Sequence, residues 1–335
     1  MASYPGNAKI RGGNTQYGFA AEATPNDGIT TGDALAWFQP LSDGLKPVIE
    51  KVELDDMGLT DDGLSSVRYV AKEHVEGDLD FIFDVDNCGM LLRAAWGAVA
   101  TSGSGPYTHT YTLDIDNPAT LGAARVSEDT AGTTYEDEYG QLLVSKYVLE
   151  ASPGGQVKQT LSLVGNIDTL GTSAATQTRA TPAPTKLLTL LSKHSAAMSW
   201  NSNTYELTAF QFVLERTGIG SDVQYVSQVG IAETYIGGNT KAYVEVEMLM
   251  SDYHLMTAAR GDTQSDASIV FTVGSDTVTL TLENAEVASY DEDSSSMGPK
   301  TVKCRFEATG GGSFGAKMVV VNSQANAVVT HNTAA

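Results

Sequence analysis

The sequence contains few residues of the kinds that bind metals or form disulfides. Among its 335 residues there are two cysteines, Cys88 and Cys304, and five histidines. The cysteines lack a CxxC spacing and are too few for a disulfide framework, which is typical of a reducing compartment. The histidines show neither an HExxH motif nor any other short paired spacing. The sequence therefore predicts neither a metal site nor a disulfide-stabilised fold.

Basic residues are also scarce. The chain has 20 Lys and Arg against 41 Asp and Glu, a formal net charge of -21. This balance excludes a module that binds DNA or RNA through phosphate contacts. Hydrophobic residues make up 41% and charged residues 18%, which excludes a disordered chain and a coiled coil. The composition indicates a globular protein of about two domains or one large β-rich unit.

Long apolar runs are missing as well. The longest small-apolar stretch, Ala94–Ala100, is interrupted by Gly97 and is far too short to cross a bilayer. Residues 1–7 have no apolar segment of the kind that signal peptides contain. We therefore expect a soluble protein without a membrane partner.

Motifs for catalysis or cofactor binding are incomplete. Asp84–Gly89 imitates the start of a calcium loop, but Ala95 stands where a bidentate Glu is needed. Residues 310–317 imitate a phosphate-binding loop, but Met318 replaces the required Ser or Thr. The paired carboxylates are expected in solvated turns. We expect no enzymatic activity, no metal and no cofactor.

Alternation of apolar and polar residues predicts a mainly β fold from Pro47 onward. The predicted strands are Val48–Leu54, Val67–Val75, Gly77–Val85, Tyr107–Leu113, Leu142–Leu149, Val157–Val164, Ala209–Glu215, Val223–Ala232, Ala242–Met250, Ser268–Val273, Thr277–Glu283, Thr301–Ala308 and Met318–Asn322. Several of these pair into long hairpins.

Two stretches predict short helices, Asp86–Ala98 and Ser251–Arg260, because each begins with a capping residue and continues through helix-forming residues. Leu91–Gly97 aligns with Leu255–Gly261 at a constant offset of 255 − 91 = 164 residues. An acidic and apolar strand precedes each helix, and a hairpin follows it. We interpret this likeness as an internal duplication of a strand, helix, strand unit.

Composition also suggests how the chain is divided. Residues 1–45 show no sustained period, and residues 166–185 are dominated by Thr, Ala and Ser with two prolines. The expected parts are an N-terminal arm over 1–45, a first unit over 46–168, a connector over 169–185, a second unit over 186–322 and a C-terminal tail over 323–335.

The alternation gives certain strands one apolar and one acidic face. Asp78, Asp80 and Asp84 alternate with Leu79, Phe81, Phe83 and Val85, and Glu245 and Glu247 alternate with Val244, Val246 and Met248. A partner strand presents Lys158, Thr160 and Ser162 on its polar side. We expect these polar residues to share one face of the fold.

Three passages resemble the major tail tube proteins of long-tailed bacteriophages, a family similar in fold to the tube protein of bacterial type VI secretion systems. They are Gly18–Thr24 with Trp37 and Pro40-Leu41, the hairpin from Tyr139 through Ser152–Gly155 to Gly165, and the strand-helix pairs that end in Gly97 and Gly261. The resemblance implies a mainly β fold with two short helices, in which a tail-tube-like β-sandwich or barrel unit is duplicated. It also implies long hairpins and an extended N-terminal arm.

In that family, rings of the protein stack into a hollow tube, and inward-facing strands line the channel through which the genome passes. The resemblance implies a non-enzymatic virion protein, assembled in the host cytoplasm. Its partners would be further copies of itself, the tail terminator, baseplate or tip proteins, and inside the channel the tape measure protein and then DNA without specific binding. The implied lumen-lining residues are Asp78, Asp80, Asp84, Lys158, Thr160, Ser162, Glu245 and Glu247. The implied contacts between rings are Tyr17, Phe19, Trp37, Pro153, Gly154 and Gly155.

The duplication also predicts a stoichiometry. If each repeat supplies four inward strands, three chains supply roughly 24 strands, and ~4.8 Å spacing with ~40° tilt gives a backbone diameter of about 48 Å. This diameter admits a DNA duplex, so we expect a trimeric ring with pseudo-sixfold symmetry. The alternative is a hexamer whose second part decorates the outside.

Two other classes of protein stay open at this point. One is a soluble β-sandwich binding or adhesin-like module, and the other is a glycoside-processing enzyme. A sugar-binding surface needs clustered exposed aromatic rings, whereas Trp37, Trp96 and Trp200 are scattered along the chain. Negative-stain microscopy would distinguish these classes from a tube protein, because only the latter forms rings or tubes.

Overall fold

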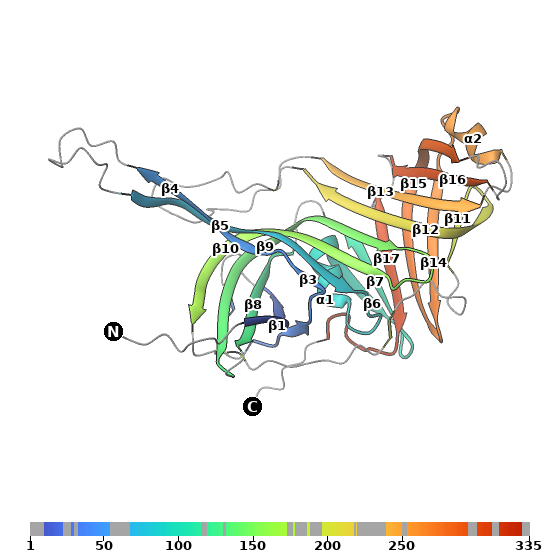
Figure 1. Ribbon diagram of the computed structural model, residues 1–335. Helices are drawn as coiled ribbons and strands as arrows, with labels where there is room; N and C mark the ends of the chain where they lie inside the picture. Colours follow the sequence, from blue (N-terminus) through green and yellow to red (C-terminus); the bar gives the residue numbers. More distant parts are fainter. Residues whose placement is uncertain are drawn as a thin grey trace, which may run out of the picture.

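The computed structural model describes residues 10–22, 28–29, 33–53, 68–114, 119–129, 132–172, 177, 186–187, 196–217, 219, 239–249, 253–293, 300–309 and 315–329. These residues form 17 strands and two short helices, which confirms the mainly β prediction (Figure 1). The predicted strand Val223–Ala232 lies outside the described residues, as does most of the predicted connector.

The first half of the chain contains ten strands and one helix. They are β1 (Ile10–Ala21), β2 (Ala36–Phe38), β3 (Ser42–Asp43), β4 (Lys46–Glu53), β5 (Arg68–Ile82), α1 (Gly89–Trp96), β6 (Gly97–Ser102), β7 (Tyr107–Leu113), β8 (Leu121–Asp129), β9 (Thr134–Ala151) and β10 (Lys158–Thr172). The helix lies where the sequence predicts it, and the β6–β7 hairpin follows it as expected.

The second half contains seven strands and one helix. They are β11 (Ala196–Trp200), β12 (Asn203–Arg216), β13 (Thr240–Leu249), α2 (His254–Ala259), β14 (Ser265–Val273), β15 (Asp276–Asp293), β16 (Thr301–Ala308) and β17 (Ala316–Asn322). Here too the helix and the hairpin after it, β14–β15, follow the prediction.

Eight strands pair side by side in the order β4, β5, β10, β9, β12, β13, β16, β15, and every pair is antiparallel. We call this arrangement the long sheet. The junction between the two halves is the pairing of β9 with β12, which joins Lys146–Ala151 to Phe210–Glu215. The order β4, β5, β10, β9 in the first half corresponds to β12, β13, β16, β15 in the second, with a helix after β5 and after β13.

A second layer packs behind the long sheet. In the first half it runs from β9 through β8 and β1 to β2. In the second it runs from β12 through β11, β14, β15, β17 and β7 to β6. Among the described strands, the two halves therefore pair at two places, β9 with β12 and β7 with β17.

The residues after β17 also pack against the first half. Asn322 Nδ2 donates to the carbonyl of Val85 at 2.9 Å, and the Tyr111 hydroxyl donates to the carbonyl of Ala327 at 3.1 Å. A side chain at Gly89 would collide with the same carbonyl, because its Cβ would lie 1.6 Å from the oxygen. Residues 323–329, part of the predicted tail, thus cross α1 as a strap.

The predicted N-terminal arm differs most from the structure. Its described part holds β1, β2 and β3, and β1 pairs with β8 from Thr15 to Ala21. The alternation that makes β1 a strand is short: Tyr17 and Phe19 are fully buried, and Gly18 lies so close to the Trp37 ring that a Cβ would be 3.0 Å from it. This segment is therefore part of the core.

Candidate functional site

The candidate site is the polar face of the long sheet, which begins on β5. Asp78 and Asp80 lie on this face, while Leu79 between them and Phe81 after them are buried. Asp80 stands directly opposite Thr160 on β10, whose hydroxyl donates to its carboxylate at 2.6 Å. Residues directly opposite each other in a sheet point to the same face. Four predicted residues, Asp78, Asp80, Thr160 and Ser162, are therefore neighbours on one surface.

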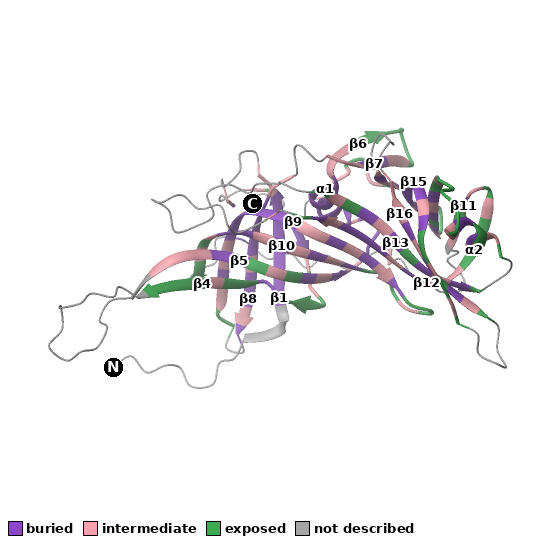
Figure 2. Ribbon diagram, turned by 90° about the horizontal axis from the view of Figure 1, so that it is seen from above, coloured by how far each residue is buried: buried purple, intermediate pink, exposed green. Residues whose placement is uncertain are grey.

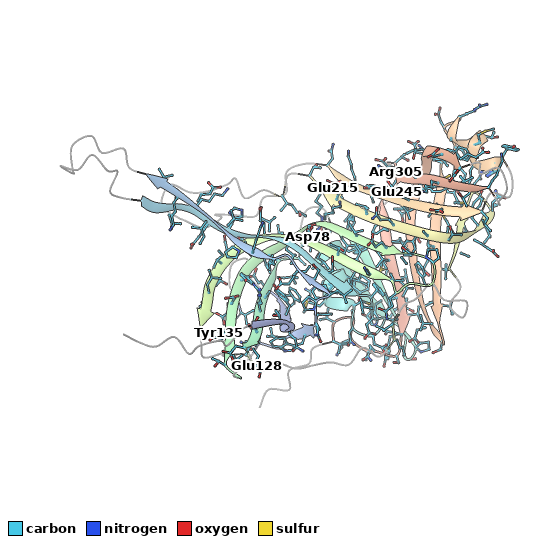
Figure 3. The ribbon with its side chains drawn as sticks, viewed as in Figure 1. Asp78, Glu128, Tyr135, Glu215, Glu245 and Arg305 are labelled. Carbon is cyan, nitrogen blue, oxygen red and sulfur yellow. The ribbon has the colours of Figure 1, made fainter. Side chains whose placement is uncertain are left out.

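The same face continues across the junction between the halves. Lys158 stands opposite Glu150 on β9, and Glu150 stands opposite Gln211 on β12, whose amide donates to its carboxylate at 3.0 Å. Gln211 stands in turn opposite Glu245 on β13. The register thus carries the polar face from the first half into the second (Figure 3).

In the second half the acids alternate with bases. Glu245 stands opposite Arg305 on β16, with 4.0 Å between carboxylate oxygen and guanidinium nitrogen, and Glu247 stands opposite Lys303, with 3.8 Å between their charged atoms. Arg305 also lies 3.6 Å from the centre of the Tyr243 ring and forms an ion pair of 3.4 Å with Glu307. These exposed pairs contribute little to stability, roughly 0 to 1 kcal/mol each, but they neutralise the acidic residues locally.

Two hollows lie on this face, one across the junction of the two halves and one within the first half. The first, of about 450 Å³, is lined by Glu150, Gln211, Glu245, Glu247, Lys303 and Arg305 among others. The second, of about 600 Å³, is lined by Lys46, Glu76, Asp78, Asp80, Ser145 and Ser162 among others. Both hollows combine acids with bases, so the face carries mixed charge, whereas five of the eight residues predicted to line the channel are acids. The bases on β16 follow the period-two pattern Lys303, Arg305 that could have revealed them.

Asp84 lies apart from this face. It is buried, and its carboxylate accepts hydrogen bonds from the backbone N–H groups of Asp86 and Lys186 at 3.1 and 3.2 Å and from the Asn87 side chain at 2.9 Å. The strand ends there, and the carboxylate fixes the turn that leads into α1. Asp84 therefore has a structural role in this chain.

Lys186 holds this turn to the second half. Its ammonium group forms ion pairs with Asp86 at 3.5 Å and with Asp276, the first residue of β15. The hydrogen bond with Asp276 raises the pKa of Lys186 above its usual value. Both carboxylates are nearly fully buried, so the lysine compensates charges that water does not reach.

Three of the predicted contacts between rings lie inside the chain. Tyr17, Phe19 and Trp37 are 0% exposed. The Tyr17 hydroxyl donates to Asp43 at 2.7 Å, and Asp43 forms an ion pair of 2.8 Å with Arg125. Burial raises the pKa of Tyr17 far above its usual value. These side chains hold β1, β2 and β3 to the first half and offer no surface to a neighbouring molecule.

The other predicted contacts form an exposed turn between β9 and β10. Pro153 and Gly154 are exposed, and the turn is closed by a hydrogen bond of 3.0 Å from the N–H of Gly155 to the carbonyl of Ser152. Gly154 has a φ of 70°, which favours glycine. This turn stays available for contact with another molecule.

A surface that the sequence analysis missed is the hairpin of β4 and β5, which projects from the body (Figures 1 and 2). Among the described residues β4 pairs with β5 alone. Ile49 and Val52 on β4 are 46% and 45% exposed. Apolar side chains on a projecting strand are typical of a surface that is covered in an assembly.

The described residues contain no group of three or more His, Cys, Asp or Glu side chains placed to hold a metal ion. Within the same residues, none of the helices has the length and apolar character needed to cross a membrane.

Comparison with known proteins identifies a family. A search of curated proteins found no similar sequence. The family model described as phage tail tube protein matches residues 12–312, a span that includes most of both halves and the whole of the long sheet. This family consists of structural components of the virion tail. The chain therefore belongs to the phage tail tube protein family.

Proposed function

We propose that this protein polymerises as stacked rings into the tail tube, with the polar face of the long sheet lining the channel through which the genome leaves the virion. The observation that carries the proposal is the long sheet itself. Its eight antiparallel strands have one buried and one polar face. Both ends of the sheet are open among the described residues, because β4 pairs with β5 alone and β15 pairs with β14 only as far as Ala285, which leaves Glu286–Asp293 paired with β16 alone. Such edges favour association with further strands.

The charge pattern of the face suits a conduit. Acids outnumber bases over the chain as a whole, and the bases on this face stand beside acids, as Arg305 stands between Glu245 and Glu307. A wall of this kind offers no continuous basic track to which phosphates could bind. We infer that the tape measure protein fills the channel before the DNA, and that DNA passes without specific contacts.

The long sheet also supports a trimeric ring. Because both halves contribute four strands to one sheet, three copies supply roughly 24 strands and a backbone diameter of about 48 Å at ~40° tilt. In a hexamer whose second half decorates the outside, β12, β13, β16 and β15 would not continue the sheet of the first half. The ring would have pseudo-sixfold symmetry, with the two halves alternating around the axis.

Contacts between stacked rings are assigned to the projecting β4–β5 hairpin and to the exposed turn Ser152–Gly155. The hairpin carries exposed apolar residues and reaches beyond the body of the chain. The tail terminator would cap one end of the tube, and baseplate or tip proteins would bind the other. Assembly would take place in the host cytoplasm.

The test is electron microscopy of the purified protein. Rings or tubes in negative stain are expected, and end-on class averages give the number of chains per ring. Particles that stay monomeric at all concentrations would contradict the proposal. True sixfold averages with six chains would contradict the trimer alone.

A further inference from the structure

The open edges of the long sheet resemble a junction that already exists inside the chain. Strand direction alternates across all eight strands, so β15 of one copy would run antiparallel to β4 of the next. Inside the chain, β9 and β12 meet in the same antiparallel manner. If β15 is equivalent to β9 and β4 to β12, the residue pairing of β9 with β12 predicts the residue pairing of β15 with β4 of the next copy.

A β-bulge gives the equivalence of β9 and β15 residue by residue. In β9, Ser145 is the extra residue between Lys146, opposite Ser162, and Val144, opposite Leu163. In β15, Ala288 is the extra residue between Ser289, opposite Arg305, and Val287, opposite Phe306. Bulges are specific features of a fold. Aligning them makes Lys146 equivalent to Ser289, an offset of 289 − 146 = 143 residues.

The neighbouring strands agree with this alignment. Ser162 and Arg305 become equivalent, and their partners across the sheet are Asp78 and Glu245. The resulting offset, 245 − 78 = 167, aligns Asp78-Leu79-Asp80-Phe81 with Glu245-Val246-Glu247-Met248. Acids match acids and buried apolar residues match buried apolar residues, although side-chain identity did not enter the alignment of the bulges.

The same register reaches the outer edge of β4. By the offset of 167, Glu76 is equivalent to Tyr243. Lys46 stands opposite Glu76, and Val213 stands opposite Tyr243, so Lys46 is equivalent to Val213. Inside the chain Val213 stands opposite Val148, and by the offset of 143 Val148 is equivalent to Asp291.

We propose that Gly44–Lys46 of one copy pairs with Asp291–Asp293 of β15 in the next copy, with Lys46 directly opposite Asp291. This inference rests on the proposed ring assembly. The apolar pair Val148–Val213 joins halves within a chain, and an ion pair joins them between chains. The two junctions thus differ at this position, apolar in one and charged in the other. A strand that entered the wrong junction would place a charged residue opposite a valine, which disfavours the wrong pairing.

The surroundings of both residues fit this pairing. Lys46 and Asp291 are exposed, and within the described part of the chain neither forms an ion pair. Pro47 follows directly and has no backbone N–H. It therefore ends the ladder between copies where the projecting hairpin begins.

The first experiment is a charge exchange. Lys46→Glu and Asp291→Lys each place like charges at the junction and should lower the ring fraction at least tenfold, whereas the double variant should restore it. Lys241→Glu makes the same charge change on β13, an interior strand, and serves as the matched control. Circular dichroism checks that each variant is folded.

The second experiment is a crosslink. Residues directly opposite in an antiparallel pair have Cα atoms about 4.5 to 5.5 Å apart, which a disulfide can span. A chain with both Lys46→Cys and Asp291→Cys should give covalently linked multimers on oxidation, because the native Cys88 and Cys304 are buried. Single-cysteine chains are the controls.

The outcomes distinguish a wrong register between copies from a wrong proposal of tube assembly. If the unchanged protein forms rings but the single charge variants assemble equally well and no crosslink forms, the register is wrong and the tube proposal stands. Assembly that the single variants lose and the double variant does not recover also overturns the pairing. If the unchanged protein forms no rings, the proposed function fails, and this inference fails with it.

Discussion

Replacing Phe212 by Ala should destabilise the protein at the place where its halves meet. Phe212 on β12 is 0% exposed, its ring stacks on Trp96 at 5.7 Å between centroids, and it lies 6.4 Å from the ring of Tyr147. Truncation of a buried Phe costs about 3 to 5 kcal/mol. Because this ring contacts two other aromatic rings, we expect the upper part of that range, about 4 to 5 kcal/mol.

The assay is equilibrium unfolding in urea, followed by tryptophan fluorescence and by far-ultraviolet circular dichroism. Trp96 lies beside the altered site, so the fluorescence transition should move to lower urea and precede the loss of β structure. Val270→Ala on β14 is the control, since Val270 is 38% exposed and should change stability by less than about 0.5 kcal/mol. A loss below about 1 kcal/mol for Phe212→Ala would refute the reasoning. It would mean that the backbone hydrogen bonds between the paired strands hold the two halves together without this aromatic contact.

Three further changes test other parts of the chain. Partial burial and the neighbouring Glu22 raise the pKa of Asp168 to about 6, so its ionisation lowers stability as pH rises from about 4 to about 6. Asp168→Asn should stabilise at pH 7 by less than about 1 kcal/mol, because part of the side chain stays in contact with water, and a gain that persists below pH 4 in thermal melts would contradict this. In the described part of the chain Arg216 is buried with two guanidinium nitrogens that lack hydrogen bonds, and burial lowers its pKa to about 10; Arg216→Met should raise the urea midpoint, and a drop of 1 kcal/mol or more would contradict this. Gly18→Ala would place a Cβ 3.0 Å from the Trp37 ring and should cost about 1 to 3 kcal/mol in the same assay, whereas an unchanged midpoint would show that the ring can shift.

Period-two alternation predicted the strands of the long sheet and the polar face that most of the candidate residues share. Alternation within a single strand shows which of its residues are polar, even when its partner strand is unknown. Asp80 on β5 and Thr160 on β10 were placed on the polar face in this way, and the structure shows them hydrogen-bonded to each other. The helices were predictable because helix-forming residues act locally, although the observed N-caps, Cys88 and Tyr253, make no side-chain capping hydrogen bond.

The parts that the sequence did not reveal depend on pairing over long distances. Nothing in the composition of Tyr17–Phe19 distinguishes a strand held by β8 from an arm held by another molecule, because both bury aromatic residues. Asp84 continues the alternation of Asp78 and Asp80, but the turn that begins there directs its carboxylate to backbone N–H groups. Both strands of the projecting hairpin were predicted, but not that the hairpin forms an exposed surface, because its exposed Ile49 and Val52 resemble core residues in sequence.

The pairing of β7 with β17 affects how fast the protein can fold. Lys317 stands opposite Thr112, so about 200 residues must be synthesised between the two strands before they meet. Closing so long a loop and pairing strands so distant in sequence slows folding. Until β17 arrives, one edge of β7 stays open in the nascent chain, and such edges attract strands of other molecules. Folding of the first half is therefore completed late, after the second half has been translated.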